Sequence, residues 1–324
     1  MPEINLASIK EKLNDEKVFI IGNSHRSVAK ITSPDNADSS SMCVIWDKKN
    51  LENLNIDIPI AAPSDFFEYG REGIACENPK TLLPKLLEIF STPVSKLTGI
   101  HPKASVSPKA KISDTAYIAA FAFVGEGCVV GDNTVIEPHA VLLKNVKVGS
   151  DCIIHSGAVI GCDGFGFVRE KDKITKIPQN GGVTICDDVE IGACTTIDRG
   201  TMNDTFIDSG TKIDNHVQIG HNVKIGKFCI ICSMTGIAGS SIIEDYVTVS
   251  VQAGITDHVK IGKGAILAGR TGVTNDVPAG VVYSGFPARP HNDAKRALVL
   301  AADLPLIVKR LRVLEKKFED FAKK

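Results

Sequence analysis

An aliphatic residue recurs at every sixth position through much of this 324-residue chain. The residue at each of these positions is Ile, Val or Leu across residues 100–160 and again across residues 207–273. The register breaks across 162–184 and slips by four residues near 201–204. A period of six matches neither the turn of an α-helix nor the plain alternation of a strand. It predicts a coil with three short flat faces of six residues each, so that eighteen residues complete one turn.

The same spacing predicts how the coil is held together. Each repeated aliphatic side chain points inward, and successive turns stack as parallel strands about 4.8 Å apart. A glycine often follows the aliphatic residue, as at Gly125, Gly192 and Gly220, and permits a tight corner between faces. A column of Ile and Val then forms the core, which accounts for an aromatic content of only 6%. We therefore expect a mainly β fold, a parallel β-helix, over residues 98–290.

Residues 1–97 do not follow the six-residue period and form a separate expected domain. Short apolar runs at 18–23, 42–47 and 72–77 predict strands. Asn78 and Pro79 are typical of a helix start and precede an apolar stretch that ends near residue 90. This pattern predicts a small α/β domain.

Residues 291–324 have a helical pattern, and Pro305 is expected to separate two C-terminal α-helices. Apolar residues in the second helix are spaced 4, 3, 4 and 3, which is typical of a coiled-coil seam. Its members are Ile307, Leu311, Leu314, Phe318 and Phe321. The seam favours a helical bundle between subunits, and packing against the chain's own coil is the alternative.

Composition excludes several classes of protein. Lys and Arg number 37 and Asp and Glu number 38, so the formal net charge of −1 gives no support for generic binding to nucleic acid or to anionic membranes. The sequence contains no apolar run long enough for a transmembrane segment, and its start lacks the features of a signal peptide. We expect a cytoplasmic protein. Nine scattered cysteines predict reduced thiols; zinc or redox chemistry at Cys229 and Cys232 is the less favoured alternative to simple packing.

Three residues in the unbroken part of the repeat are candidates for chemistry. His221 follows the inward Ile219 by two positions, which places it at a corner of the coil. Gly239 lies eighteen residues further on, and His258 lies nineteen beyond that, so all three should line one edge of the coil. A histidine base beside a backbone N–H that faces a developing oxyanion is an arrangement suited to acyl transfer. A histidine on the surface with no function is the alternative for each histidine taken singly.

Several motifs carry a resemblance to a known family: IGCDGFGF (160–167), IPQNGGV (177–183), VEIGACTTIDRG (189–200), DNHVQIGHNVKIG (214–226), AGS (238–240) and YSGFPARPHNDAKRAL (283–298). They resemble the UDP-3-O-acylglucosamine N-acyltransferases, which belong to the hexapeptide-repeat acyltransferases. The resemblance implies a left-handed parallel β-helix and a homotrimer with active sites between neighbouring coils. It also implies transfer of a 3-hydroxyacyl chain to the 2-amino group of UDP-3-O-acylglucosamine in lipid A biosynthesis. The donor would be acyl carrier protein, which presents the chain on phosphopantetheine, with no metal and no other cofactor.

The resemblance also implies roles for single residues. His221 matches the family's general base, Gly239 its oxyanion donor, and His258 a histidine that helps to bind substrate or donor groups. Asn222 and Gln218 flank the base and are candidate contacts to substrate or donor.

The N-terminal domain departs from the family, in which two aromatics and an asparagine grip uracil. The comparable segment here is MCVIWDKKN, residues 42–50. Trp46 is a candidate for stacking on a base and Lys49 for meeting phosphate, whereas Trp46 as a core residue is the alternative.

Three other functions compete with this interpretation. The first is a hexapeptide N-acyltransferase that acts on a different amino sugar or sugar nucleotide and takes its acyl group from acyl-CoA or another carrier. The second is a trimeric β-helix zinc hydratase, for which His216 and His221 have the spacing of two ligands. The third is a scaffold without catalytic activity.

Overall fold

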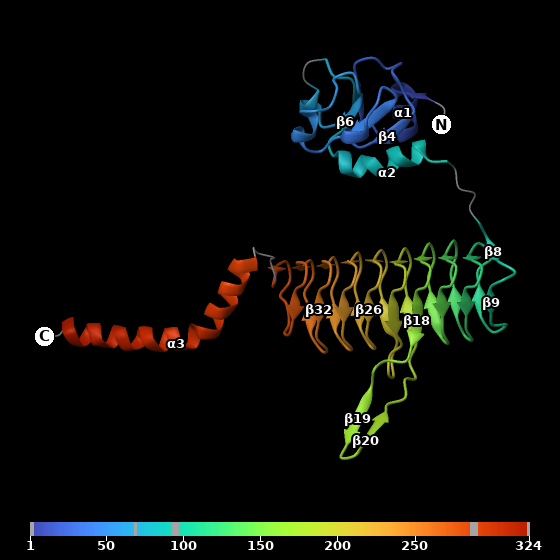
Figure 1. Cartoon of the computed structure of the whole chain (residues 1–324). Coiled ribbons are helices and arrows are strands. Elements are labelled where there is room, and N and C mark those ends of the chain that lie inside the picture. Colours follow the sequence, from blue (N-terminus) through green and yellow to red (C-terminus); the bar gives the residue numbers. More distant parts are fainter. Residues whose placement is uncertain (1–2, 68–69, 93–96, 286–290, 323–324) are drawn as a thin grey trace. The chain divides into compact units, whose positions relative to one another are not determined.

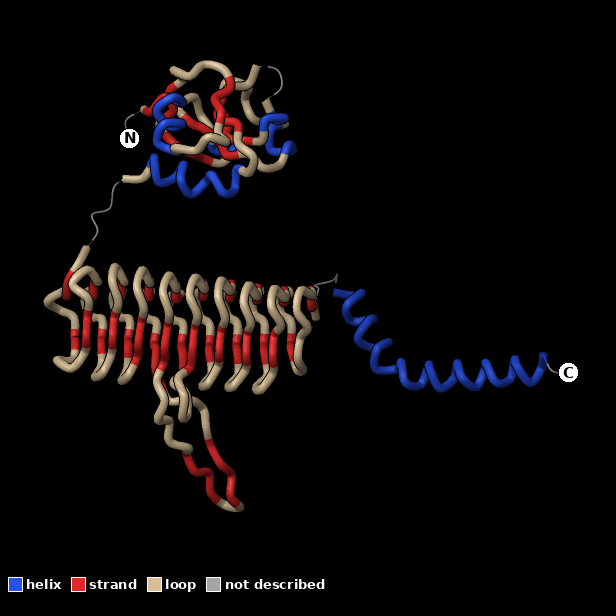
Figure 2. Tube along the Cα trace, turned by 180° about the vertical axis from the view of Figure 1, so that it is seen from behind, coloured by secondary structure: helices blue, strands red, loops and turns tan. Residues whose placement is uncertain are grey.

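The structure, a computed structural model, describes residues 3–67, 70–92, 97–285 and 291–322. Two compact units divide the chain, Met1–Lys96 and Leu97–Lys324, and they are drawn in Figures 1 and 2. The expected boundary at 290/291 and parts of the linker and of the motif at 283–298 lie outside the described residues. None of the helices in the described ranges combines the length and the apolar composition needed to span a bilayer.

The N-terminal unit is built on a five-stranded sheet in the order β2-β7-β6-β5-β4, in which only the pair β2–β7 is antiparallel. The strands expected at 18–23, 42–47 and 72–77 are confirmed, and so is the helix that starts at Pro79. The strands are β1 (Ile4–Asn5), β2 (Phe19–Ile21), β3 (Ser27–Val28), β4 (Lys30–Thr32), β5 (Ser41–Val44), β6 (Ile60–Ala62) and β7 (Gly73–Ala75). The helices are α1 (Leu6–Leu13), α2 (Pro79–Phe90) and the 3₁₀ turns η1 (Pro34–Asn36), η2 (Lys48–Leu51) and η3 (Ser64–Phe66).

Strand β5 divides its side chains between two cores because successive residues of a strand point to opposite faces. Met42 and Val44 pack with the apolar residues of α1 and α2. Cys43 and Ile45 join a second cluster on the other face of the sheet. Trp46 is the next residue, and its side chain is 48% exposed, so the alternative that placed Trp46 in the core is wrong.

The second unit contains a left-handed parallel β-helix with three faces, as predicted. We call the faces A, B and C in the order in which the chain visits them. Face A holds β8 (Gly99–Ile100), β11 (Tyr117–Ile118), β14 (Val135–Ile136), β17 (Ile153–Ile154), β22 (Glu190–Ile191), β25 (Lys212–Ile213), β28 (Ile230–Ile231), β31 (Thr248–Val249), β34 (Ile266–Leu267) and β36 (Val282–Tyr283). Face B holds β9 (Ser105–Val106), β12 (Phe123–Val124), β15 (Val141–Leu142), β18 (Val159–Cys162), β23 (Thr196–Asp198), β26 (Gln218–Ile219), β29 (Gly236–Ile237), β32 (Gly254–Ile255) and β35 (Gly272–Val273). Face C holds β10 (Lys111–Ile112), β13 (Val129–Val130), β16 (Val146–Val148), β21 (Val183–Ile185), β24 (Thr205–Ile207), β27 (Lys224–Ile225), β30 (Ile242–Ile243) and β33 (Lys260–Ile261).

The repeated aliphatic residue is the second residue of nearly every strand, and it is buried in one continuous core. Strand pairs keep a register of eighteen residues through the unbroken part of the coil, so that Ile219 pairs with Ile237 and Ile237 with Ile255. Most strands contribute one inward side chain, which the neighbouring turns of the coil cover.

The corners depend on one backbone position that recurs every six residues. The third residue after the inward aliphatic has a positive φ through most of the coil, as at Asn222 (φ 61°) and His258 (φ 57°). This left-handed region is uncommon for residues other than glycine, and Asn, Asp and His are among those that enter it most often. The corner geometry therefore limits which side chains this position accepts.

Two insertions interrupt the coil, and both leave it at the corner between faces B and C. The longer insertion carries an antiparallel hairpin of β19 (Phe167–Glu170) and β20 (Lys173–Lys176), which extends from the side of the coil in Figures 1 and 2. The shorter one follows β23 and accounts for the slip near 201–204. The broken register of the sequence therefore marks one edge of the coil.

The C-terminal segment forms one helix, α3 (His291–Ala322), and the expected break at Pro305 is wrong. The helix is bent along its length in Figures 1 and 2. A proline inside a helix removes one hydrogen bond and commonly produces a kink of this kind, without ending the helix.

The alternation of inward and outward residues gives a direct test of the coil's energetics. Ile243 is 1% exposed and its neighbour Ile242 is 42% exposed on the same strand, β30. We expect Ile243→Ala to lower the free energy of unfolding by about 2–5 kcal/mol, because it removes buried methyl groups and leaves a cavity. Ile242→Ala is the matched control and should cost less than about 0.5 kcal/mol. Urea unfolding followed by circular dichroism measures both, and equal costs would contradict the assignment of the inward row.

Candidate active site

His221, Gly239 and His258 lie on the same corner, between faces B and C, as the register predicted. The turns that carry them are adjacent, because the N–H of Ser240 donates to the carbonyl of His221 at 2.8 Å and the N–H of His258 donates to that of Gly239 at 3.2 Å. His221 and Gly239 occupy the second position after the inward residue, and His258 occupies the third. The three residues therefore form a short row along one edge of the coil.

The hydrogen bonds around His221 fix which ring nitrogen is free. The backbone N–H of Thr201 donates to Oδ1 of Asn222 at 3.0 Å, which identifies that atom as the amide oxygen. The same Oδ1 lies 3.1 Å from Nδ1 of His221. An oxygen acceptor requires Nδ1 to carry a proton, so the neutral ring keeps its lone pair on Nε2. His221 is therefore held with Nε2 ready to accept a proton.

Two glycines make room for the His221 ring. A Cβ added to Gly239 would lie 2.7 Å from both Cε1 and Nε2 of His221. A Cβ added to Gly164, in the longer insertion, would lie 2.5 Å from Cβ of His221 and 2.8 Å from Cγ and Cδ2. The ring is thus enclosed by the next turn of the coil and by the insertion, and its basic nitrogen lies against the backbone of Gly239.

The N–H of Gly239 belongs to a class of outward-facing donors on this coil. At the equivalent position, two residues after the inward one, on the corner between faces C and A, the N–H groups of Ser150, Lys227 and Lys263 donate to carboxylates of a neighbouring turn at 2.7, 3.0 and 2.8 Å. Within the described ranges, the Gly239 N–H donates no backbone hydrogen bond. A donor of this kind beside a base is available to an oxyanion that forms at the corner.

An acidic side chain lies next to the base. Gln218 donates from Nε2 to Oδ2 of Asp198 at 3.1 Å, and the hydroxyl of Thr196 hydrogen-bonds to Oε1 of Gln218. Burial and the nearby carboxylate of Asp163 raise the pKa of Asp198, although Gln218 and His221 act in the opposite direction. Gln218, predicted to contact substrate or donor, here links a threonine to this carboxylate.

The other two predicted residues of this corner, Asn222 and His258, differ in their surroundings. Asn222 uses its amide on His221, on Thr201 and, through Nδ2, on the carbonyl of Asn203 at 3.3 Å. These contacts favour a role in orienting the base. The side chain of His258 is exposed.

Sequence reasoning did not single out Gly164 or Asp198 as parts of the site. Both belong to motifs that the sequence displays, DGFGF and TTIDRG. Gly164 approaches His221 because of the path of the longer insertion, whereas Asp198 is the last residue of β23 and is placed beside Gln218 by the register of the coil. Arg199, the next residue, donates from Nε to the carbonyl of Gly161 at 3.0 Å and from Nη2 to that of Lys144.

The geometry does not support the zinc hydratase. His216 lies on the corner between faces A and B, whereas His221 lies on the next corner. In the part of the chain that the structure describes, no group of three His, Cys, Asp or Glu side chains is placed to hold a metal ion.

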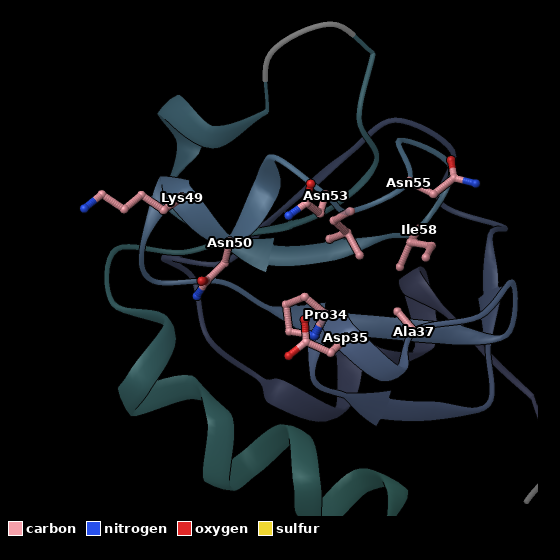
Figure 3. Close-up of a pocket in the computed structure, with 9 residues that line it drawn as sticks. Pro34, Asp35, Ala37, Lys49, Asn50, Asn53, Asn55 and Ile58 are labelled. Atoms are coloured by element: carbon pink, nitrogen blue, oxygen red, sulfur yellow. The ribbon is translucent and has the colours of Figure 1, made fainter.

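The N-terminal unit contains a cleft of about 580 Å³ between η1 and the segment that includes η2. Its lining combines polar side chains with the apolar residues Ala37, Leu54 and Ile58. Figure 3 shows Pro34 and Asp35 on one side and Asn50 and Asn53 on the other, while Lys49 extends away from the rest. Trp46 is not among the lining residues; its ring lies 5.7 Å from Nζ of Lys80. The structure therefore does not bring Trp46 and Lys49 together in this cleft.

A second cleft, of about 560 Å³, extends over several turns of the coil along face A and its corner with face B, and His155 is one of the residues that line it. Nδ1 of His155 lies 3.1 Å from Glu137 and Nε2 lies 2.9 Å from Glu190. Glu137 also accepts the backbone N–H of Ser156 at 3.0 Å. Burial lowers the pKa of His155, but the two carboxylates outweigh it and raise the pKa above its usual value. The histidine is suited to being doubly protonated, with one carboxylate on each nitrogen.

This arrangement predicts a pH-dependent stability. Because the folded-state pKa of His155 is raised, its contribution is complete below the unfolded value near 6.5 and is lost as the pH rises through the folded value. We expect the difference in melting temperature between the parent protein and His155→Gln to be larger at pH 6 than at pH 9. His216→Gln, which replaces another histidine on the corner between faces A and B, is the control for the loss of a histidine at that corner. A difference for His155→Gln that grows with pH would contradict the assignment.

Parts of this chain are similar in sequence to known proteins. The family described as bacterial transferase hexapeptide (six repeats) matches residues 127–162. A UDP-3-O-acylglucosamine N-acyltransferase from Methylobacterium nodulans is 44% identical over 175 residues, which are 54% of this chain and 48% of the relative. Another, from Methylorubrum populi, is 49% identical over 148 residues, or 46% and 42% of the two chains. The chain spans about half the length of the curated relatives it matches.

A solved structure has the same coil. The crystal structure of a UDP-N-acetylglucosamine O-acyltransferase from Moraxella catarrhalis superposes with a TM-score of 0.53 at 28% identity and covers 59% of this chain and 73% of that one. Together with the sequence matches, this makes the second unit of the chain a hexapeptide-repeat β-helix related to the UDP-3-O-acylglucosamine N-acyltransferases.

Proposed function

We propose that this chain is an N-acyltransferase of lipid A biosynthesis. It would transfer a 3-hydroxyacyl chain from acyl carrier protein to the 2-amino group of UDP-3-O-acylglucosamine. The observation that carries the proposal is the corner at which Nε2 of His221, freed by the hydrogen bond of Nδ1 to Asn222, lies against the backbone of Gly239. The names of the relatives supply the substrate class.

The chemistry follows from the positions of these groups. Nε2 of His221 accepts a proton from the amine as its nitrogen attacks the thioester carbonyl, and the N–H of Gly239 donates to the oxyanion that forms. The C–N bond forms, the C–S bond of the thioester breaks, and the proton leaves with the thiol. These reaction steps use neither a metal nor a covalent intermediate on the protein.

The binding of the two substrates completes the proposal. His258 is exposed one turn beyond Gly239 and is the candidate contact for a phosphate group of either substrate. The N-terminal unit would hold the nucleotide, with Trp46 for stacking and Lys49 for phosphate. A homotrimer would bring a neighbouring copy to the open side of the His221 corner. In this proposal the protein acts in the cytoplasm.

The decisive experiment mixes the purified protein with UDP-3-O-acylglucosamine and 3-hydroxyacyl carrier protein and follows the N-acylated product by mass spectrometry. A parallel panel offers acyl-CoA as donor and other UDP-amino sugars as acceptors. We expect product only from the first pair. Product only from another acceptor or from acyl-CoA would replace the substrate assignment, and no product from any pair would overturn the activity.

A further inference from the structure

Asp198 is a carboxylate of the His221 corner that the acyl-transfer steps described above do not use. It is the last residue of β23, and its side chain is half-buried. The register between β23 and β26 places it beside Gly220, the residue that precedes His221. Asp198 therefore belongs to the turn before His221, whereas Gly239 belongs to the turn after it. A carboxylate and a backbone N–H thus flank the base from opposite sides.

Other carboxylates at the equivalent position hold adjacent turns together. Three of them follow an inward aliphatic residue by one position, and each accepts a backbone N–H of the next turn, at 3.0, 3.1 and 2.8 Å. They are Glu137, Asp214 and Glu244. The equivalent donor for Asp198 is the N–H of His221, because these donors follow the inward residue of the next turn by two positions. In the described part of the chain, Asp198 does not accept that bond and is bound by the side chain of Gln218 instead.

The Asp198 carboxylate retains the capacity to accept further hydrogen bonds. Gln218 donates to Oδ2, and among the described residues no lysine or arginine forms an ion pair with Asp198. The cations nearby have other partners: Lys176 pairs with Asp163, and Arg199 donates to backbone carbonyls. Burial raises the pKa of Asp198, so its charge is only partly hydrated. A carboxylate has two accepting oxygens, and Oδ1 is available to a donor on a bound molecule.

An attacking amine brings one more hydrogen to this corner than a hydroxyl group does. Its lone pair is directed at the thioester carbonyl, so two N–H groups remain to be paired. Nε2 of His221 accepts one of them. We propose that Asp198 accepts the other and thereby selects an amino group over a hydroxyl group at the same carbon of the acceptor. This inference rests on the proposed function and names the residue that makes the reaction an N-acylation.

The selection follows from what a hydroxyl group leaves unpaired. Its single hydrogen is used on Nε2 of His221, and its remaining lone pair then faces the carboxylate of Asp198. A site built to bind an N–H disfavours an analogue without it, because a partly buried acceptor loses its donor. The same contact costs the amine nothing, since the hydrogen that it uses has no other acceptor in the reaction described above.

Steady-state kinetics of the full protein tests this selection. The donor is 3-hydroxyacyl carrier protein, the substrate is UDP-3-O-acylglucosamine, and the competitive inhibitor is the same sugar nucleotide with a hydroxyl group in place of the 2-amino group. Asp198→Asn keeps an oxygen for Gln218 and places an N–H donor where the second carboxylate oxygen was. It should lower kcat/KM for the amine by about 10–100-fold, the range that a hydrogen bond to a charged group supplies. The Ki of the hydroxyl compound should fall, because its lone pair then meets a donor.

Two further variants separate selection from folding. Asp198→Ala removes the acceptor without adding a donor, so kcat/KM for the amine should fall while the Ki stays within about twofold. Asp208→Asn is the matched control, since Asp208 also follows an inward residue by one position but lies on the corner between faces C and A. Both constants should stay within about twofold in this variant. Circular dichroism confirms that each variant is folded.

The outcomes distinguish this inference from the activity on which it rests. An active parent protein with unchanged constants in Asp198→Asn would overturn the inference alone. Weaker binding of both compounds to the same extent would do so as well, because it would assign Asp198 to the shape of the corner. A parent protein that does not acylate the amine would overturn the proposed function, and the selection by Asp198 with it.

Discussion

Replacing His221 with alanine is expected to lower kcat for acyl transfer by about 10²–10⁴-fold, because general-base help from a positioned side chain is typically worth this much. The β-helix should remain folded, since His221 lies at a corner outside the aliphatic core. Steady-state kinetics with the carrier-protein donor and the UDP-amino sugar give the ratio. The substrate KM values should change less than kcat.

His216→Ala is the matched control for this change. His216 is exposed on the preceding corner and has the same left-handed backbone that recurs at corners (φ 57°). Its removal should leave kcat within about twofold. If both variants kept full activity, the base would lie elsewhere; if both lost it, the effect would belong to the fold and not to the chemistry.

Gly239→Ala is expected to lower kcat by about 10²-fold with little loss of stability. The new Cβ would lie 2.7 Å from Nε2 of His221, closer than such atoms approach, so the ring must move away from the corner. The clash is with the end of a side chain that can shift, which keeps the cost to folding small. A displacement of this size at the reacting atoms is enough for such a loss of rate.

Gly236→Ala provides the comparison on the same turn. A Cβ at Gly236 meets nothing within 4 Å, so the variant should keep both its stability and its activity unless substrate covers that position. Kinetics and thermal melting of the two variants together separate the local effect from a general intolerance of this turn to alanine. Equal activity of Gly239→Ala and the parent protein would contradict the role assigned to the Gly239 backbone.

The architecture could be predicted because its rule is local. An inward aliphatic at every sixth position and a fixed turn of eighteen residues place Ile219, Ile237 and Ile255 above one another without knowledge of any other contact. The same arithmetic brought His221, Gly239 and His258 to one edge. Pro305 was misjudged because a proline weakens a helix by a few kcal/mol without excluding it, and the flanking turns of α3 retain their own hydrogen bonds.

The sequence by itself determined the period, the faces and the edge that carries the histidine, because a repeating chain sets these through nearest neighbours alone. Only the tertiary structure decided what surrounds His221. Gly164 reaches the ring from an insertion, and Thr201 fixes the Asn222 amide that selects the ring's free nitrogen. Both approaches come from segments that leave the repeat, where no period predicts the path of the chain, and they depend on contacts between residues that are distant in sequence.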